Sequence, residues 1–439
     1  MFDRTINNSR ICNYFNFLIA LIPLSFIVGN TIININLVLI ILSTFFFFKN
    51  FLFKLQYFIV DKLLFIFFLL ILFSAISNDI NYYLYHKDFS DWKGPYETTL
   101  KSLGFFRFFI LYLSIRYLIE NKIINLKFFF ISCTIFTTLV CLDIFYQLYF
   151  GKDVFGYESI ARKFPGPFGD EPIAGGYILR FSLFALFLYP IYLLNKSLKF
   201  SYLFLAIFLI IYPTAILISG NRMPLLLFIL LITSIFIFQK DLRKFFLLFC
   251  LIFSLVFLLA FKFNDKVKGN FINLNYQINE MVSFIIPGIS KGNEAKLQGF
   301  NTYLDQFKSF KDTWLMNKYI GGGIKNFRYN CHLAKSKIDK KKYICNMHPH
   351  NYYLEILTET GIAGFLLIFA IFILSFYNVI SKISLATLVL NYQIITPFIF
   401  LFLIEVFPFK GTGSFFTTVN ASYLFLIMGI MIGLVRKQN

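Results

Sequence analysis

Apolar residues recur along the whole chain in long runs, each close to the roughly 20 residues that a helix needs to cross a bilayer. The runs lie at roughly 13–29, 31–48, 60–77, 103–119, 126–150, 173–194, 200–218, 222–238, 244–262, 352–378, 386–407 and 415–435. The pattern predicts an all-α, polytopic transmembrane bundle of about 12 helices.

One long polar stretch, from 263 to 351, interrupts this pattern. It divides the chain into nine predicted helices over 1–262, a large external loop over 263–351, and three predicted helices over 352–439. No Gly/Ser-rich linker or internal repeat separates these parts. We therefore expect one membrane domain that carries an external subdomain.

Lys and Arg in the short connections set the orientation, because positive charge near helix ends stays on the cytoplasmic side. The predicted cytoplasmic cations are Arg4, Arg10, Lys49, Lys54, Arg116, Lys122, Lys127, Lys196, Lys199, Lys240, Arg243, Lys244, Lys382, Arg436 and Lys437. Both termini are then cytoplasmic. The segments around 78–102, 151–172 and 219–222 face outward, together with the large loop.

Composition excludes an ordinary soluble domain, since 58% of the residues are hydrophobic and only 14% are charged. The net charge of +19 indicates an anionic partner. In a membrane protein this favours anionic lipid or an anionic substrate over nucleic acid.

Six cysteines are present. Cys12, Cys133, Cys141 and Cys250 lie in or beside apolar runs, where cysteine is usually a small buried hydrophobe. Cys331 and Cys345 both lie in the large loop and enclose a Lys-rich segment. They predict a disulfide if that side is oxidising, and two unpaired thiols otherwise.

All four histidines fall on the predicted outer side, two of them in the string His348-Pro349-His350-Asn351 directly before a helix. Asn351 is a good helix-capping residue, so His350 is expected at the membrane surface. A neutral imidazole there can take a proton from an attacking hydroxyl, as a glycosyl-transfer general base does.

Two carboxylates, Glu355 and Glu359, follow on one helical face with Asn351. Carboxylates in a helix that enters the membrane are costly unless they are paired or near water. Together with His348, these residues are candidates to orient the base or to bind an acceptor sugar. The alternative is a solvated first helical turn.

Three arginines, Arg107, Arg180 and Arg222, fall in the outer part of predicted helices. A single such arginine can snorkel to the interface, which is the simpler interpretation for Arg107, but three at one depth suggest an anion site. Arg222 follows a tight turn at a helix N-terminus, an arrangement that suits a diphosphate. No Walker loop, His-Glu-x-x-His or Asp-x-Asp motif occurs, which favours a metal-independent mechanism without a cofactor.

The segment HPHNYYLEILTETGIAG, at 348–364, resembles the signature that ends the large periplasmic loop in the O-antigen ligase and O-antigen polymerase superfamily. Weaker matches are SGNRMP at 219–224, FKDTWLMNKYIGGGIKNFRYNC at 310–331 and FGDEPIAGGYILR at 168–180. With the helix count and the loop placement, the resemblance covers most of the chain.

The resemblance implies an enzyme of the bacterial inner membrane whose active site faces the periplasm. It would pass a glycan from undecaprenyl diphosphate to a hydroxyl of lipid A-core, with His350 activating that hydroxyl and Arg222 binding the diphosphate. The family commonly has a second arginine early in the large loop, but no Arg occurs between Arg243 and Arg328. Arg328 or Lys296 is the candidate to replace this second arginine as a diphosphate ligand. Lys would bind more weakly, because it lacks the planar guanidinium that binds phosphate oxygens in a bidentate manner.

Three other functions stay open from the sequence. O-unit polymerisation, in which the acceptor is a growing glycan, uses the same donor chemistry. A lipid-linked glycan flippase also suits about twelve helices with intramembrane Arg, although it needs no large loop with a histidine. A protein that only binds anionic polysaccharide through its basic loop is the third.

Overall fold

The computed structural model describes residues 2–85, 96–160, 163–192, 198–285, 300–336, 344–382, 393–411 and 413–437. Over these ranges the chain is helical and forms no named β-strand, only two isolated bridges in the 152–163 loop. The prediction of an all-α polytopic membrane protein is confirmed.

The α-helices are α1 (Phe2–Ala20), α2 (Ile22–Val28), α3 (Asn30–Phe47), α4 (Phe51–Lys54), α5 (Ile59–Tyr85), α6 (Glu97–Phe105), α7 (Arg107–Glu120), α8 (Leu126–Phe150), α9 (Ala174–Tyr192), α10 (Leu198–Ile218), α11 (Arg222–Phe238), α12 (Phe246–Phe263), α13 (Asp265–Ile285), α14 (Phe300–Met316), α15 (Phe327–Ser336), α16 (Tyr352–Ile380), α18 (Thr396–Glu405) and α19 (Thr418–Lys437). Short 3-10 turns lie at Gly166–Phe168 (η2) and Lys240–Phe245 (η3).

Eight spans among the described residues are long and apolar enough to cross a membrane, or nine if α12 and the start of α13, bent by 104°, form one span. Three shorter apolar helices, Phe208–Ile218, Arg222–Phe238 and Thr396–Glu405, fall within three further predicted runs. Every predicted run therefore overlaps a helix. The total of about twelve crossings stays a prediction.

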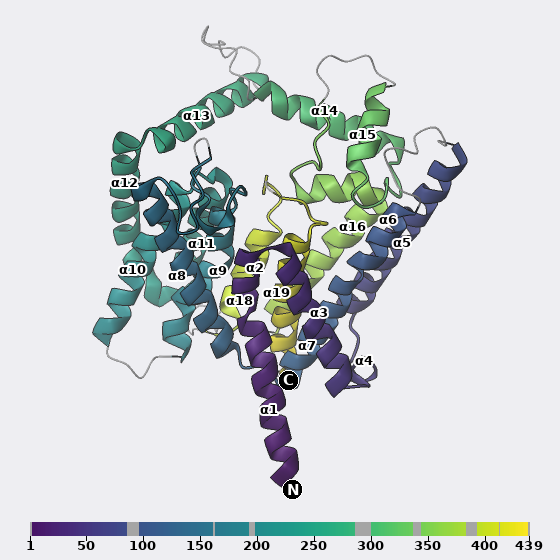
Figure 1. Ribbon diagram of the computed structural model, residues 1–439, viewed down its shortest axis with the longest axis horizontal. Coiled ribbons are helices and arrows are strands. Elements are labelled where there is room, and N and C mark those ends of the chain that lie inside the picture. Colours follow the sequence, from purple (N-terminus) through teal and green to yellow (C-terminus); the bar gives the residue numbers. More distant parts are fainter. Residues whose placement is uncertain are drawn as a thin grey trace.

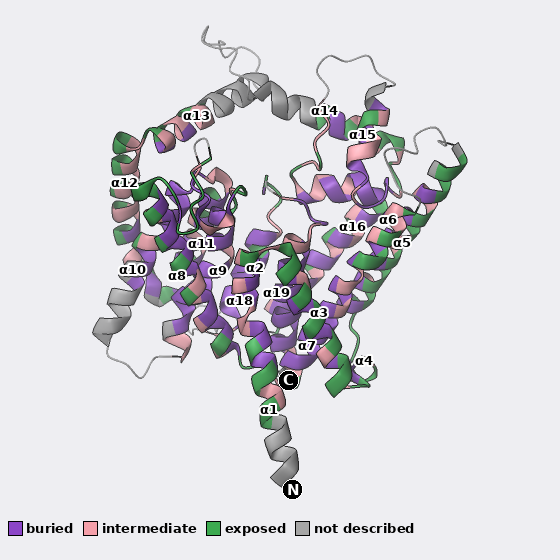
Figure 2. Cartoon of the chain, viewed as in Figure 1, coloured by how far each residue is buried: buried purple, intermediate pink, exposed green. Residues whose placement is uncertain are grey.

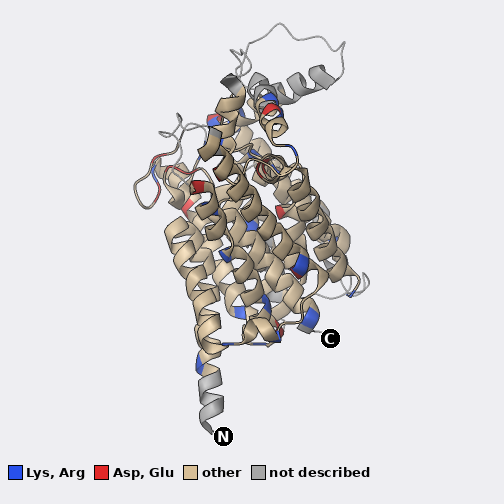
Figure 3. Ribbon diagram, turned by 90° about the vertical axis from the view of Figure 1, so that its right-hand side faces the viewer, with Lys and Arg blue, Asp and Glu red and all other residues tan. Residues whose placement is uncertain are grey.

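Both termini lie at one end of the molecule, and α13, α14 and α15 lie at the opposite end (Figure 1). Figure 2 shows buried positions gathered inside the bundle and exposed positions on its outer faces. Large apolar side chains such as Phe46 and Leu251 are exposed there, as expected for surfaces in contact with lipid. Charged residues are sparse along the middle of the helices (Figure 3).

Local sequence explains individual helix ends and contacts. The side chain of Asn125 caps α8 by accepting a hydrogen bond from Lys127 N at 3.0 Å, and Gly151 ends that helix at a φ of 81°. Gly429 and Gly433 let α19 approach α7 closely, because a Cβ atom at Gly433 would lie 3.0 Å from the Ile119 side chain.

A buried ion pair differs from the sequence expectation that placed Arg116 among the loop cations. The Arg116 side chain is fully buried on α7, with Nη1 2.5 Å from Asp61 Oδ2 on α5. Its Nε donates to Glu120, which also binds Arg436 of α19. Arg116 therefore joins α7 to α5 directly and to α19 through Glu120.

The helix α16 is broken at Gly361, where φ is 68° and ψ is −173°. The segment 318–323 inserts its backbone at this break. Ile362 N donates to Lys318 O at 2.9 Å, and Gly323 N donates to Glu359 O at 2.8 Å. The inserted segment thus pairs backbone groups that the helix leaves free, as irregular backbone in a membrane protein requires.

Replacing Gly361 by Ala is expected to destabilise the fold by about 2–5 kcal/mol, since a Cβ atom would lie 2.2 Å from Tyr319 O on a positive-φ backbone. The measurement is the midpoint of thermal unfolding in detergent. Gly176→Ala is the matched control, because a Cβ atom there meets nothing within 4 Å. Equal midpoints for the two variants would contradict the tight insertion.

Candidate active site

The start of α16 is fixed by Asn351, whose side chain accepts hydrogen bonds from Tyr353 N at 3.0 Å and Leu354 N at 3.1 Å. Directly before this cap, His350 adopts a positive φ of 57°. Its ring centroid lies 4.4 Å from that of His348. The predicted capping therefore occurs, and it holds two imidazoles together where the chain enters α16.

The surroundings keep both imidazoles neutral. Partial burial lowers the pKa of His350, which still exposes part of its surface. Burial, helped by the neighbouring His350 and the positive charge of Arg328, lowers the pKa of His348 to about 4. At pH 7 both rings are thus in the form that accepts a proton.

The described residues of the connection between α18 and α19, 406–411 and 413–417, pack against this region. The Asn351 side chain donates to Pro408 O at 2.8 Å, and Tyr353 Oη donates to Val406 O at 2.5 Å. On its other side, Gly411 lies close to Met223 of α11. The connection therefore links the start of α16 to the start of α11, a role that the sequence analysis did not assign to it.

Arg180 lies in a buried ion cluster rather than open to a ligand. Its guanidinium binds both carboxylate oxygens of Glu405, at 2.7 and 3.2 Å, and Nη2 donates to Asn420 Oδ1 at 2.5 Å. Lys410 Nζ lies 2.6 Å from the same carboxylate. Tyr352 Oη also donates to Glu405, at 2.7 Å. The cluster thus gathers two cations around one anion.

Lys410 was not singled out from the sequence. Burial lowers its pKa to about 8, with Glu405 opposing the effect and Arg180 adding to it. A lysine that follows a proline and an aromatic residue in a short loop gives no local signal, because its partner Glu405 is identified only by the fold.

The two carboxylates of α16 are buried, each about 1% exposed, so the alternative of a solvated first turn is wrong. Glu355 accepts hydrogen bonds from Ser414 Oγ and Phe415 N, both at 2.5 Å. Glu359 Oε2 accepts one from Lys325 N at 2.7 Å. The two glutamates therefore hold neighbouring loops in place around the start of α16.

Arg222 begins α11 after the turn 219–221, as expected. Asn221 fixes this turn against the start of α9, accepting from Gly175 N at 3.0 Å and donating to Pro172 O at 2.7 Å. Burial and the positive charge of Arg222 lower the pKa of Lys163. Phe164 N donates to Ser219 O at 3.3 Å, so Lys163 lies beside the turn that precedes Arg222. We name Arg222 and Lys163 the α11 basic group.

Arg328, another predicted phosphate ligand, lies on a different part of the fold from Arg222 (Figure 1). Arg328 lies on α15, near enough to His348 and Lys325 for its charge to lower the pKa of both. Figure 1 shows α15 among α5, α6 and α16, whereas α11 lies among α8 to α12. Lys296 lies outside the described residues.

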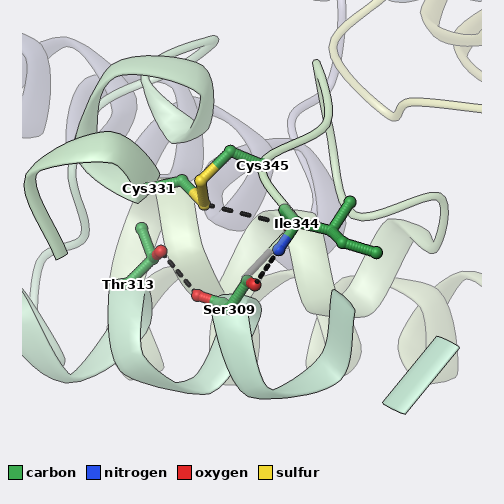
Figure 4. Close-up of a disulfide and its surroundings, with 5 residues drawn as sticks. All are labelled: Ser309, Thr313, Cys331, Ile344 and Cys345. Carbon is green, nitrogen blue, oxygen red and sulfur yellow. Dashed lines mark hydrogen bonds between the residues drawn. A yellow bond between two sulfur atoms is a disulfide. The ribbon is translucent and has the colours of Figure 1, made fainter. Parts of the chain in front are cut away.

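Cys331 and Cys345 are joined by a disulfide with a Cα–Cα distance of 5.7 Å (Figure 4). Ile344 N donates to Ser309 Oγ at 3.1 Å, which ties the segment before His348 to α14. Phe310, Phe327 and Ala334 form a small core with the disulfide, packed against Leu354 and Leu357 of α16. The α14–α15 unit is thereby attached beside the two histidines.

Within the described ranges, no three His, Cys, Asp or Glu side chains gather in a way that would hold a metal ion. The metal-independent mechanism stays a prediction.

Residues 181–369 match the sequence model of the O-antigen ligase family. The matched range contains Arg222, the helices α12 to α15 and the start of α16 with His350. No curated protein matches the chain. Its helical membrane fold agrees with the family match. Over residues 181–369, the chain therefore carries an O-antigen ligase family domain.

Proposed function

We propose that the protein transfers a glycan from undecaprenyl diphosphate to a hydroxyl of an acceptor such as lipid A-core, at the periplasmic face of the bacterial inner membrane. The observation that carries the proposal is His350, which lies directly before the capped start of α16 and whose pKa is lowered by partial burial. The placement of both termini at the end opposite α13–α15 supports cytoplasmic termini and a periplasmic site (Figure 1).

In the proposed reaction, His350 accepts the proton of the acceptor hydroxyl as its oxygen attacks the anomeric carbon of the donor sugar. The bond between that carbon and the diphosphate oxygen breaks, and undecaprenyl diphosphate leaves with the electron pair. Arg222, at the N-terminus of α11, stabilises the charge that develops on the diphosphate. No external oxidant, reductant or cofactor is needed for this exchange.

The test is to incubate the purified protein with undecaprenyl diphosphate-linked glycan and a separate acceptor. We expect release of undecaprenyl diphosphate together with a labelled acceptor. Growth of the lipid-linked glycan without labelling of lipid A-core would identify a polymerase instead. If neither product forms while the donor is bound or moved across the membrane, the enzymatic proposal is wrong.

Arg222→Gln is expected to raise the donor KM and to slow turnover, together lowering kcat/KM by about 10²-fold, because a charge-assisted contact to the leaving diphosphate is lost. Arg222→Lys is the matched control, which keeps the charge and loses the bidentate fork, so it should retain more activity. Unchanged kinetics with donor in the Gln variant would rule out Arg222 as the diphosphate ligand.

A further inference from the structure

A second set of basic residues lies on α6, α7 and α15, and α6 and α15 lie away from α11 (Figure 1). It consists of Lys101 on α6, Arg107 at the start of α7, Lys325 before α15 and Arg328 on α15. We name it the α6–α15 basic group. None of its members except Arg328 was assigned to a ligand above, and Arg107 was interpreted as a snorkelling side chain.

Direct contacts hold these elements together. Thr98 Oγ1 donates to Asn326 Oδ1 at 3.2 Å, and Tyr329 Oη donates to Glu97 Oε2 at 3.4 Å, which joins α6 to the start of α15. The peptide N–H of Lys325 is fixed by Glu359 at 2.7 Å. These bonds hold α6, which carries Lys101, against the start of α15, which carries Lys325 and Arg328. Arg107 begins α7, two residues after the end of α6.

The positive charges of this group affect the pKa of Lys325. The pKa of Lys325 is lowered first by burial and then by the positive charges of Lys101, Arg328 and Arg107, with Glu359 opposing them. Lys101 forms an ion pair with Glu97. Two further carboxylates lie close by, because Glu355 interacts with Lys325 and Asp79 accepts a hydrogen bond from Thr99 N of α6 at 2.8 Å. The four cations therefore lie among four carboxylates, Glu97, Glu359, Glu355 and Asp79.

Two guanidinium groups keep a donor unused. Arg107 Nε and Arg328 Nε are both buried and have no hydrogen-bond partner among the described residues. The other nitrogens of Arg107 do have partners, because Nη1 donates to Gly104 O and Nη2 to Thr418 Oγ1 at 3.3 Å. A buried N–H group without an acceptor costs free energy unless a ligand supplies that acceptor. Phosphate oxygens are strong acceptors for the N–H groups of a guanidinium.

We propose that the α6–α15 basic group binds a phosphate group of the acceptor substrate. The inference rests on the proposed function and adds to it that the acceptor is phosphorylated close to its reacting hydroxyl. The group lies near the histidines, since the disulfide joins Cys331, three residues after Arg328 on α15, to Cys345, three residues before His348. In this proposal the α11 basic group binds the diphosphate of the donor. Each substrate then has its own anion site, and His350 lies directly before α16.

A phosphate on the acceptor has two sources with the same chemistry. It belongs to a phosphorylated lipid A-core if the protein is a ligase, and to a second undecaprenyl diphosphate-linked unit if it is a polymerase. Kinetics with each acceptor, and with a dephosphorylated lipid A-core, distinguish the two sources.

The experiment measures the KM of donor and acceptor for the full-length protein and for Arg328→Gln and Lys325→Asn. Asn removes the charge and tolerates the positive φ of 57° at position 325. Each variant should raise the KM of the phosphorylated acceptor about 10- to 100-fold, with the donor KM unchanged. Lys311→Gln, an exposed cation on α14, is the matched control and should change neither value.

With the dephosphorylated acceptor, the unmodified protein should already show the raised KM, and the variants should raise it no further. An equal increase for phosphorylated and dephosphorylated acceptors would overturn the inference, and so would an increase in the donor KM alone. Both outcomes leave the proposed transferase function intact. Absence of transfer by the unmodified protein with any acceptor would instead refute the proposed function itself.

Discussion

His350→Ala is expected to lower the rate of glycan transfer by about 10²–10⁴-fold, because the acceptor hydroxyl loses the group that removes its proton. Its pKa is lowered by burial, so the imidazole is neutral at pH 7. The protonated ring cannot act as a base. The rate should therefore fall as the pH drops through the pKa of His350, which lies below the ordinary histidine value near 6.5. The measurement is a pH–rate profile of the purified protein, with undecaprenyl diphosphate release as the readout.

His348→Ala is the matched control for this prediction. It removes the ring that lies 4.4 Å from His350, while Asn351 still caps α16. We expect a smaller loss of rate, since His348 is placed to orient the base. Retention of full activity by His350→Ala, in a protein that inserts normally, would refute the general-base role.

Glu405→Gln is expected to destabilise the protein by about 3–5 kcal/mol, because it leaves the buried charges of Arg180 and Lys410 without their anion. The substitution keeps the size of the side chain, so no cavity contributes. The measurement is the midpoint of thermal unfolding in detergent, with the yield of inserted protein as a second readout.

Two further variants test the cause of that effect. Glu158→Gln removes one partner of an exposed ion pair with Lys152 and should have almost no effect. Lys410→Met in the Glu405→Gln background removes one of the two uncompensated charges and should recover part of the stability. A Glu405→Gln protein as stable as the unmodified one would show that the ion cluster does not hold α9, α18 and the 406–417 connection together.

Much of the architecture is readable from the chain because lipid imposes a simple rule on it. A helix must be apolar over its whole crossing, so hydropathy alone predicts where helices lie, including α3, α8 and α19. The cap at Asn351 and the turn before Arg222 are also local, since the groups that form them are neighbours in sequence.

Contacts between distant segments were decided only by the tertiary structure. Arg180 pairs with Glu405, and backbone at Tyr319 packs into the break of α16 at Gly361. Neither contact can be predicted from the hydrophobic periodicity of the sequence. Arg116 illustrates the same limit, because a cation at a helix end looks like a loop charge until Asp61 is placed beside it.

The sequence by itself thus determined the membrane class, the position of the helices and the string that contains His350, because these depend on the transfer of each segment from water to lipid and on neighbouring residues. The tertiary structure decided which charges are paired with one another and which side chains gather around the histidine. The physical reason is that burying a charge is tolerated only beside its partner, and the partner is brought there by helix packing rather than by sequence.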